Sequence, residues 1–106
     1  MVKRFEVYLV SLDPEPSTNA KNTRPCVVIS PDEMNDNLRN VIIAPISSNT
    51  LDHPTRLKFD FLNSERSMIL DQIRSVDKDR LVKRIGEIDA AAQKQTLERL
   101  QELFAE

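Results

Sequence analysis

Residues 22–30 read NTRPCVVIS, in which an arginine and a proline directly precede a run of β-forming apolar residues. The β-branched residues Val27, Val28 and Ile29 that follow Pro25 favour a buried strand. A proline is tolerated as the first residue of a strand, because the strand ladder does not yet need its N–H there. The pattern predicts a strand over residues 25–30, with Arg24 at its entrance and on the same face as Cys26 and Val28.

Two interpretations of Arg24 are open from these residues. The first is structural, an ion pair between the guanidinium and a neighbouring carboxylate. The second is functional, an anion clamp, because a guanidinium stays charged and matches a phosphate group in a bidentate manner. The residue stands beside a long polar segment, residues 13–23, which predicts a loop next to it.

Outward from this stretch, short β-rich segments alternate with polar loops. The predicted strands are residues 5–12, 25–30, 40–47, 56–61, 67–76 and 83–88, with short helical turns at 31–33, opened by Ser30 as the N-cap, and at 78–81. Pro45 inside the third strand suggests a sheet edge or a bulge. The chain has one glycine, Gly86, so tight hairpins that need left-handed backbone should be scarce.

The period of the apolar residues changes in the last segment. Leu97, Leu100, Leu103 and Phe104 recur at helical spacing, and Asp89 is a suitable N-cap. We therefore predict an amphipathic helix over residues 90–105. The predicted fold is mostly β (β+α), a single domain over residues 1–106 in which a small, bent sheet or barrel carries short helical turns and a C-terminal amphipathic helix.

Composition limits the class of protein. The formal net charge is −2 over 106 residues, so no global basic field indicates a nucleic-acid partner. Cys26 is the single cysteine, which rules out an intramolecular disulfide and suits a reducing compartment. The longest apolar run, residues 41–46, is too short to cross a bilayer, and the first residues lack the apolar core of a signal peptide. The expected location is the cytoplasm, with no membrane partner.

Several kinds of catalytic centre are disfavoured. One histidine and one cysteine do not make a metal site, and one glycine cannot make a glycine-rich phosphate loop. A Ser-His-Asp arrangement would need His53 as its base, and a single loop histidine between Asp52 and Pro54 favours a solvated position. No metal or other cofactor is therefore expected.

Polar residues at strand ends are the remaining candidates. Ser47 directly follows an apolar run and could present its hydroxyl at the rim of the sheet, although loop serines commonly bind local backbone. In the predicted strand 67–76, alternation sets Gln72 and Arg74 on one face, about 7 Å apart by strand rise. That spacing suits contact with a base edge and a phosphate of one nucleotide.

Asp71 falls on the other face of the same predicted strand, together with Ile69 and Ile73. We expect its carboxylate to be partly buried, which is costly unless it is satisfied by a partner. It could hold a loop or Arg24, or act on a substrate. Basic residues also outnumber acidic ones between residues 66 and 84, which permits a local phosphate-binding surface.

Four segments, taken in order, resemble the MazF/PemK family of toxins from bacterial toxin–antitoxin pairs. They are VYLVSLDP at residues 7–14, TRPCVVIS at 23–30, VIIAPISS at 41–48 and LDQIRSVD at 70–77. The resemblance implies a small SH3-like β-barrel with a C-terminal helix, acting as a homodimer. It also implies a metal-independent, sequence-selective endoribonuclease that cleaves single-stranded RNA, including mRNA.

The resemblance implies a role for each candidate residue. Arg24 would lie at the RNA-cleaving centre with Ser47 beside it, the first stabilising charge and the second binding the scissile phosphate. RNA carries its own nucleophile, the 2′-OH, so alignment and charge neutralisation suffice, and the products would be a 2′,3′-cyclic phosphate and a 5′-OH. Gln72 and Arg74 would position the substrate, with Asp71 in support.

Two regions depart from the family pattern, the first loop and the residue before the first strand. The usual Gly-Ser-Glu step of the first loop is replaced by Ser17, Thr18 and Asn19, which makes Asn19 a candidate for supporting the substrate, and Thr18 stands where some members have a catalytic histidine. Phe5 stands where a glycine usually precedes the first strand. The family also implies a cognate antitoxin that folds over the RNA site as it binds. The alternative to an enzyme is a non-catalytic binding protein on the same barrel, either a gyrase-poison-like relative or an inactive toxin remnant.

Overall fold

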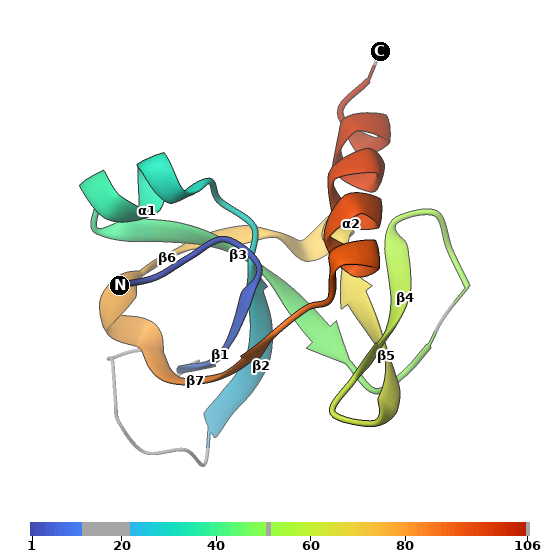
Figure 1. Cartoon of the computed structure of the whole chain (residues 1–106), viewed down its shortest axis with the longest axis horizontal. Coiled ribbons are helices and arrows are strands. Elements are labelled where there is room, and N and C mark those ends of the chain that lie inside the picture. Colours follow the sequence, from blue (N-terminus) through green and yellow to red (C-terminus); the bar gives the residue numbers. More distant parts are fainter. Residues whose placement is uncertain (12–21, 51, 106) are drawn as a thin grey trace.

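The computed structural model describes residues 1–11, 22–50 and 52–105 (Figure 1). Within them, the strands are β1 (Glu6–Ser11), β2 (Thr23–Val28), β3 (Asn40–Ser47), β4 (Arg56–Phe61), β5 (Ser64–Ile69), β6 (Arg74–Asp77) and β7 (Leu81–Glu87). The helices are α1 (Asp32–Asn37) and α2 (Ala90–Leu103), with 3-10 turns η2 (Leu70–Gln72) and η3 (Lys78–Arg80). This confirms the mostly β fold with a C-terminal helix.

Strand β3 organises the sheet. The sheet runs in the order β4-β5-β3-β2-β1-β7, and β6 also pairs with β3. Along one edge of β3 the partner changes, because β6 pairs up to Ile43 and β5 pairs from Ile46 onward. Pro45 lies in that interval, where neither ladder reaches this edge of β3. The expected edge or bulge at Pro45 is therefore a break between two ladders, and β3 itself is not an edge strand of the sheet.

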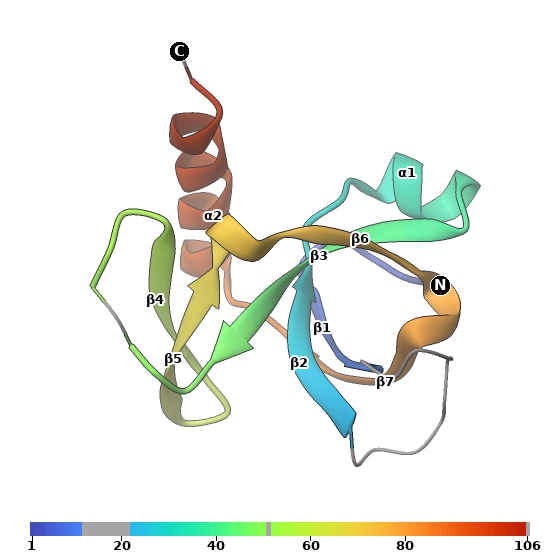
Figure 2. The same cartoon turned by 180° about the vertical axis from the view of Figure 1, so that it is seen from behind.

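The sheet is curled into a half-barrel, with β4, β5 and α2 on one side of β3 and β1, β2, β6 and β7 on the other (Figures 1 and 2). Each face of the central strands buries its own apolar cluster. We name them the helix-side core and the barrel-side core. The helix-side core contains Val27, Ala44, Ile46, Leu57, Phe59, Met68 and Ile88 among others. The barrel-side core contains Val10, Cys26, Val28, Val41, Ile43 and Val76.

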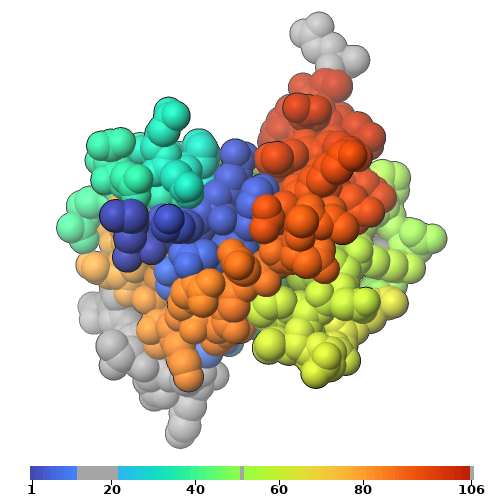
Figure 3. All heavy atoms as spheres, in the orientation of Figure 1, coloured from blue at the N-terminus to red at the C-terminus, as the bar shows by residue number. Residues whose placement is uncertain are grey.

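Helix α2 covers the helix-side core and lies against the β4–β5 hairpin (Figure 3). The Asp89 side chain accepts a hydrogen bond from the Ala92 N–H at 2.8 Å, which confirms the predicted N-cap. Leu97 and Leu100 pack on the core, as their spacing predicts. Phe104 lies past the end of the helix and is 70% exposed, so it is not part of the buried face. Neither helix of the described residues has the length and apolar character needed to span a membrane.

The predicted strand over residues 67–76 was wrong. The structure divides it into the end of β5, the 3-10 turn η2 and the strand β6. The Leu70 N–H donates to the Thr55 carbonyl at 2.9 Å, and Leu70 itself is buried. Leu70 is the buried residue of the turn, whereas Asp71 and Gln72 are exposed. Two polar residues between buried apolar ones are also compatible with a strand, so the pattern did not reveal the turn.

Among the described residues, three other than glycine have left-handed backbone. Phe5 has φ 74° and is 9% exposed, with its N–H donating to Val28 and its carbonyl accepting from Ile88. Core packing of the ring therefore keeps a conformation that is strained for phenylalanine, at the position where the resemblance places a glycine. Leu62 and Asn63 have φ 51° and 63° and connect β4 to β5 in two residues. The expectation that such tight hairpins are scarce therefore fails at this turn.

Ser30 does not cap α1 as predicted. The N-cap is Pro31, without a side-chain hydrogen bond. The Ser30 hydroxyl instead donates to the Asn35 side chain and accepts from the Ile42 N–H. This buried polar pair connects the short helix to β3.

Candidate active site

Arg24 lies near the start of β2, where it pairs with Val10 of β1. It alternates with Cys26 and Val28, which belong to the barrel-side core, so its side chain lies on that face at the open end of the strand. The residue is exposed. Within the described part of the chain, its guanidinium makes no hydrogen bond or ion pair. The ion-pair interpretation of Arg24 therefore has no support among these residues.

Ser47 is the last residue of β3 and is half-buried. Its hydroxyl oxygen accepts a hydrogen bond from the Asn49 backbone N–H at 3.0 Å. This is the local backbone contact expected of a serine at a strand end. The hydroxyl hydrogen is not used in that bond, so Ser47 can still donate to a ligand.

The strand register relates these two residues. Cys26, Val27 and Val28 of β2 pair with Pro45, Ala44 and Ile43 of β3. Continued by two residues on both strands, the same register sets Arg24 across from Ser47 on one face.

The opposite face supports this register. Pro25 and Ile46, the alternate neighbours of Arg24 and Ser47, line one small cavity of about 100 Å³. Leu9, Phe61, Leu62, Arg66 and Ile85 complete its walls. An apolar cavity on one face and the polar pair on the other are consistent with unbroken alternation along β2 and β3.

A second arginine contributes positive charge to the same face. Arg74 opens β6, pairs with Ile43 and alternates with Val76 of the barrel-side core. Burial raises the pKa of the Cys26 thiol to about 11, and the charges of Arg24 and Arg74 both act to lower it. Cys26 is therefore a protonated core residue near two guanidinium groups, and its thiol is not activated as a nucleophile.

Asp71 and Gln72 lie in η2, not on a strand. Strand alternation therefore does not apply between Gln72 and Arg74, so the argument that predicted a common face for this pair does not hold. Both Gln72 and Arg74 are exposed.

Asp71 is exposed as well, which contradicts its expected burial. Its carboxylate pairs with the Arg56 guanidinium, with Nε to Oδ1 at 3.2 Å, and accepts from the Thr55 hydroxyl at 3.1 Å. Its partner is thus Arg56 and not Arg24. Sequence reasoning missed Thr55 and Arg56, because only the packing of η2 against the start of β4 brings them to Asp71.

His53 contacts Thr55 and so belongs with Asp71 and Arg56, not with the candidate residues Arg24 and Ser47. Its Nδ1 is 2.8 Å from the Thr55 hydroxyl and accepts from the Thr55 N–H at 3.2 Å. The residue is exposed, as expected of a loop histidine. No group of three or more His, Cys, Asp or Glu residues that could hold a metal ion occurs among the described residues. Asn19 lies outside the described residues.

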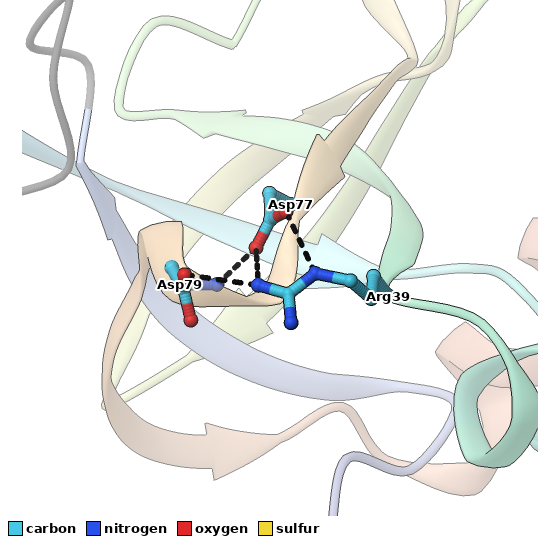
Figure 4. Close-up of polar contacts among 3 residues, drawn as sticks. All are labelled: Arg39, Asp77 and Asp79. Carbon is cyan, nitrogen blue, oxygen red and sulfur yellow. Dashed lines mark hydrogen bonds and ion pairs between the residues drawn. The ribbon is translucent and has the colours of Figure 1, made fainter.

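Other charged residues are paired into the scaffold. Arg39 contacts both Asp77 and Asp79, at 3.4 and 3.1 Å (Figure 4). Glu6 is 8% exposed and is paired with Arg84. Burial acts to raise the pKa of Glu6, but the Lys3 backbone N–H and the Arg84 guanidinium together hold the pKa below its usual range. Each of these carboxylates neutralises the arginine that it contacts. The guanidinium of Arg24 has no such carboxylate among the described residues.

The arrangement around Arg24 is suited to a phosphodiester. It offers two guanidinium groups without described partners and one hydroxyl donor, on the strands β2, β3 and β6. Guanidinium groups stay charged and bind phosphate oxygens through paired N–H donors. The burial of the adjacent strand segments fixes the backbone that carries these side chains.

The chain has clear relatives among known proteins. A family model described as "PemK-like, MazF-like toxin of type II toxin-antitoxin system" matches residues 3–104. Endoribonuclease MazF9 of Mycobacterium tuberculosis is 34% identical over 101 residues, which cover 86% of each chain.

Solved structures show the same fold. An endoribonuclease in complex with its cognate antitoxin, from a mycobacterial species, superposes with a TM-score of 0.80 at 19% identity, covering 96% of this chain and 93% of that one. A MazE–MazF structure from Deinococcus radiodurans also gives 0.80 at 19% identity, covering 98% and 95%. The family match and the curated relative together establish that the chain belongs to the PemK-like, MazF-like toxins of type II toxin–antitoxin systems.

Proposed function

We propose that the chain is a metal-independent endoribonuclease toxin that cleaves single-stranded RNA, including mRNA, at selected sequences. The observation that carries the proposal is Arg24, an exposed guanidinium without a described partner. The β2–β3 register, extended by two residues, sets it across from the hydroxyl of Ser47. Its family and the activity named for its 34% identical relative support the proposal.

The proposed reaction uses the nucleophile of the substrate. The 2′-OH of one nucleotide attacks the adjacent phosphorus and gives its proton to solvent. The bond from phosphorus to the 5′ oxygen of the next nucleotide breaks, and that oxygen takes up a proton from solvent. The products are a 2′,3′-cyclic phosphate and a 5′-OH. Arg24 stabilises the extra negative charge that develops on the phosphate oxygens, and Ser47 donates its hydroxyl hydrogen to one of them.

We assign supporting roles to the residues that follow β5. Arg74 adds a second positive charge on the face of Arg24, and Gln72 is exposed in the turn that leads to it. Both are placed to hold the nucleotides next to the cleaved bond. Asp71 positions this turn through Arg56 and Thr55. Asn19 is proposed as a further contact from the first loop.

We further propose that the toxin acts as a cytoplasmic homodimer and is neutralised by a cognate antitoxin protein. Membership in a toxin–antitoxin family supports the antitoxin, and an RNA substrate together with a single free thiol suits the cytoplasm. The endoribonuclease from a mycobacterial species was solved with its own antitoxin, which supports the same kind of partner here.

The alternative is a non-catalytic binder that uses the end of α2. The specific observation behind it is a pair of exposed apolar side chains, Leu103 at 38% and Phe104 at 70%. A binder of this kind would depend on Phe104 and not on Arg24 or Ser47.

Incubation of the purified protein with a long RNA in EDTA separates the two proposals. We expect cleavage at defined sites with 5′-OH ends, which polynucleotide kinase can label directly. The Phe104→Ala variant should cleave as fast as the unmodified protein. Intact RNA at high protein concentration would overturn the enzyme and favour the binder.

A further inference from the structure

Ser47 belongs to a row of polar side chains that crosses the sheet. On one side the register of β2 and β3 leads to Arg24. On the other side Ser47 pairs with Ser67 of β5, and Ser67 pairs with Lys58 of β4. Residues that pair across strands share a face of the sheet. Ser47, Ser67 and Lys58 therefore lie in register on one face of three adjacent strands. The β2–β3 register, extended by two residues beyond its last pair (Cys26 with Pro45), sets Arg24 at the end of this row.

The row has a positive charge at each end and hydroxyl groups between them. Lys58 is exposed, and within the described residues its ammonium makes no ion pair. Ser67 is fully buried, and its hydroxyl has no hydrogen-bond partner in the described part of the chain. Because Ser67 is fully buried, other groups cover the sheet at that point. The residues that pair from Ser47 to Lys58 include no carboxylate.

The neighbours of Lys58 on the same face define the extent of the row. Arg56 lies two residues before it and is neutralised by Asp71. Asp60 lies two residues after it and stands across from Glu65 in the β4–β5 ladder. The carboxylates of Asp60 and Glu65 lie toward the hairpin turn and repel phosphate there. The favourable surface for an anion therefore ends at Lys58.

We propose that Lys58 binds a phosphate next to the scissile one, so that the RNA backbone crosses the strands from β2 toward β4. This inference rests on the proposed endoribonuclease function and names a further substrate contact of the same site. Three strand spacings separate the Cα positions of Arg24 and Lys58, which is about 14 Å. Both side chains are long and flexible, so their charged groups can approach neighbouring phosphates of one single strand. Lys58 does not touch the reacting atoms, and its effect belongs to substrate binding.

The test compares Lys58→Gln with Lys94→Gln in cleavage of an oligonucleotide that contains one cleavage site. Lys94 is an exposed lysine on α2, which packs on the helix-side core, so its removal takes the same charge from the other face. For Lys58→Gln we expect KM to rise by roughly two- to fivefold with kcat unchanged. The logarithmic slope of binding against salt, between about 50 and 200 mM, should fall by about 0.7. Lys94→Gln should change neither quantity.

A modified substrate locates the contact. A neutral methylphosphonate is placed, one position at a time, at each phosphate flanking the cleavage site. At one position the substitution should raise the KM of the unmodified protein as much as Lys58→Gln does, and should then have no further effect on the variant. Cleavage by the unmodified protein with an unchanged KM and salt slope in Lys58→Gln would overturn this inference alone. Absence of cleavage by the unmodified protein would instead overturn the proposed function.

Discussion

Strand β6 has an arginine near each of its ends, and among the described residues only one of the two is paired with a carboxylate. At its end, Asp77 pairs with Arg39 and accepts the Asp79 N–H at 2.8 Å (Figure 4). At its start, Arg74 has no hydrogen bond or ion pair among the described residues and lies near Arg24 beside Cys26. A guanidinium that already holds a carboxylate has its charge neutralised at that place. A guanidinium without one retains its charge and its donors for an anion from outside.

The difference has a consequence for stability and activity. Exposed ion pairs such as that of Arg39, whose side chain is 75% exposed, contribute little to stability. Arg24, which has no described partner, should contribute even less to the free energy of unfolding. The two regions should therefore respond differently in an activity assay and not in a melting curve.

The largest expected effect is that of Arg24→Ala set against Arg39→Ala. Arg24→Ala should lower kcat/KM for RNA cleavage by on the order of 10² to 10³, because it removes the charge that stabilises the transition state. Arg39→Ala should retain full activity. Both variants should melt within about 2 °C of the unmodified protein. A folded Arg24→Ala protein that still cleaves RNA would refute the assignment.

The next effect in size is that of Ser47→Ala, with Ser48→Ala as its matched control. Loss of one hydrogen bond to a charged phosphate should lower kcat/KM by roughly ten- to a hundredfold. Ser48 is exposed and adjacent in sequence, and its replacement should have no effect on the rate. Equal rates for the two variants would remove Ser47 from the site.

Asp71→Asn tests whether Asp71 supports the fold or takes part in the reaction. Asp71 pairs with Arg56, whose side chain is 21% exposed, and it accepts from Thr55. We expect Tm to fall by about 2–4 °C, with a smaller loss of activity than in Ser47→Ala. Asp52→Asn, an exposed carboxylate in the preceding loop, serves as the control. A loss of activity at unchanged Tm would make Asp71 part of the chemistry instead.

The smallest effect is on the thiol of Cys26, which lies near Arg24 and Arg74, two arginines without partners among the described residues. Because burial raises the pKa of Cys26 to about 11, the folded protein should show thiolate absorbance only at strongly alkaline pH. The unfolded chain loses this proton at lower pH, so stability should decrease as pH rises above the ordinary thiol pKa. Arg24→Ala should move the native titration to still higher pH, since it removes one charge that favours the thiolate. An unchanged titration would show that the two charges do not act on Cys26.

Some elements could be predicted closely and others could not. Residues 40–47 and 56–61 form strands with the predicted bounds. In β4 the alternation of apolar and polar residues is strict, whereas in residues 67–76 a buried apolar stretch is followed by the exposed Asp71 and Gln72 of a turn, without a glycine or proline to mark it. Phe5 gives no local sign of its left-handed backbone, which depends on the burial of its ring. Arg24 and Ser47 could be named as candidates from residue type and position, but their partners could not.

The amino-acid sequence by itself determined the strand that follows Arg24, the helix capped by Asp89 and the residue types available for binding phosphate. Tertiary structure decided which of those charges are neutralised. Arg39 meets Asp77 from 38 residues away, while Arg24 meets no described carboxylate. It also decided that Ser47, Ser67 and Lys58 stand in one row. The reason is physical: local periodicity specifies only the faces of a single strand, whereas register and charge pairing arise when distant strands pack together.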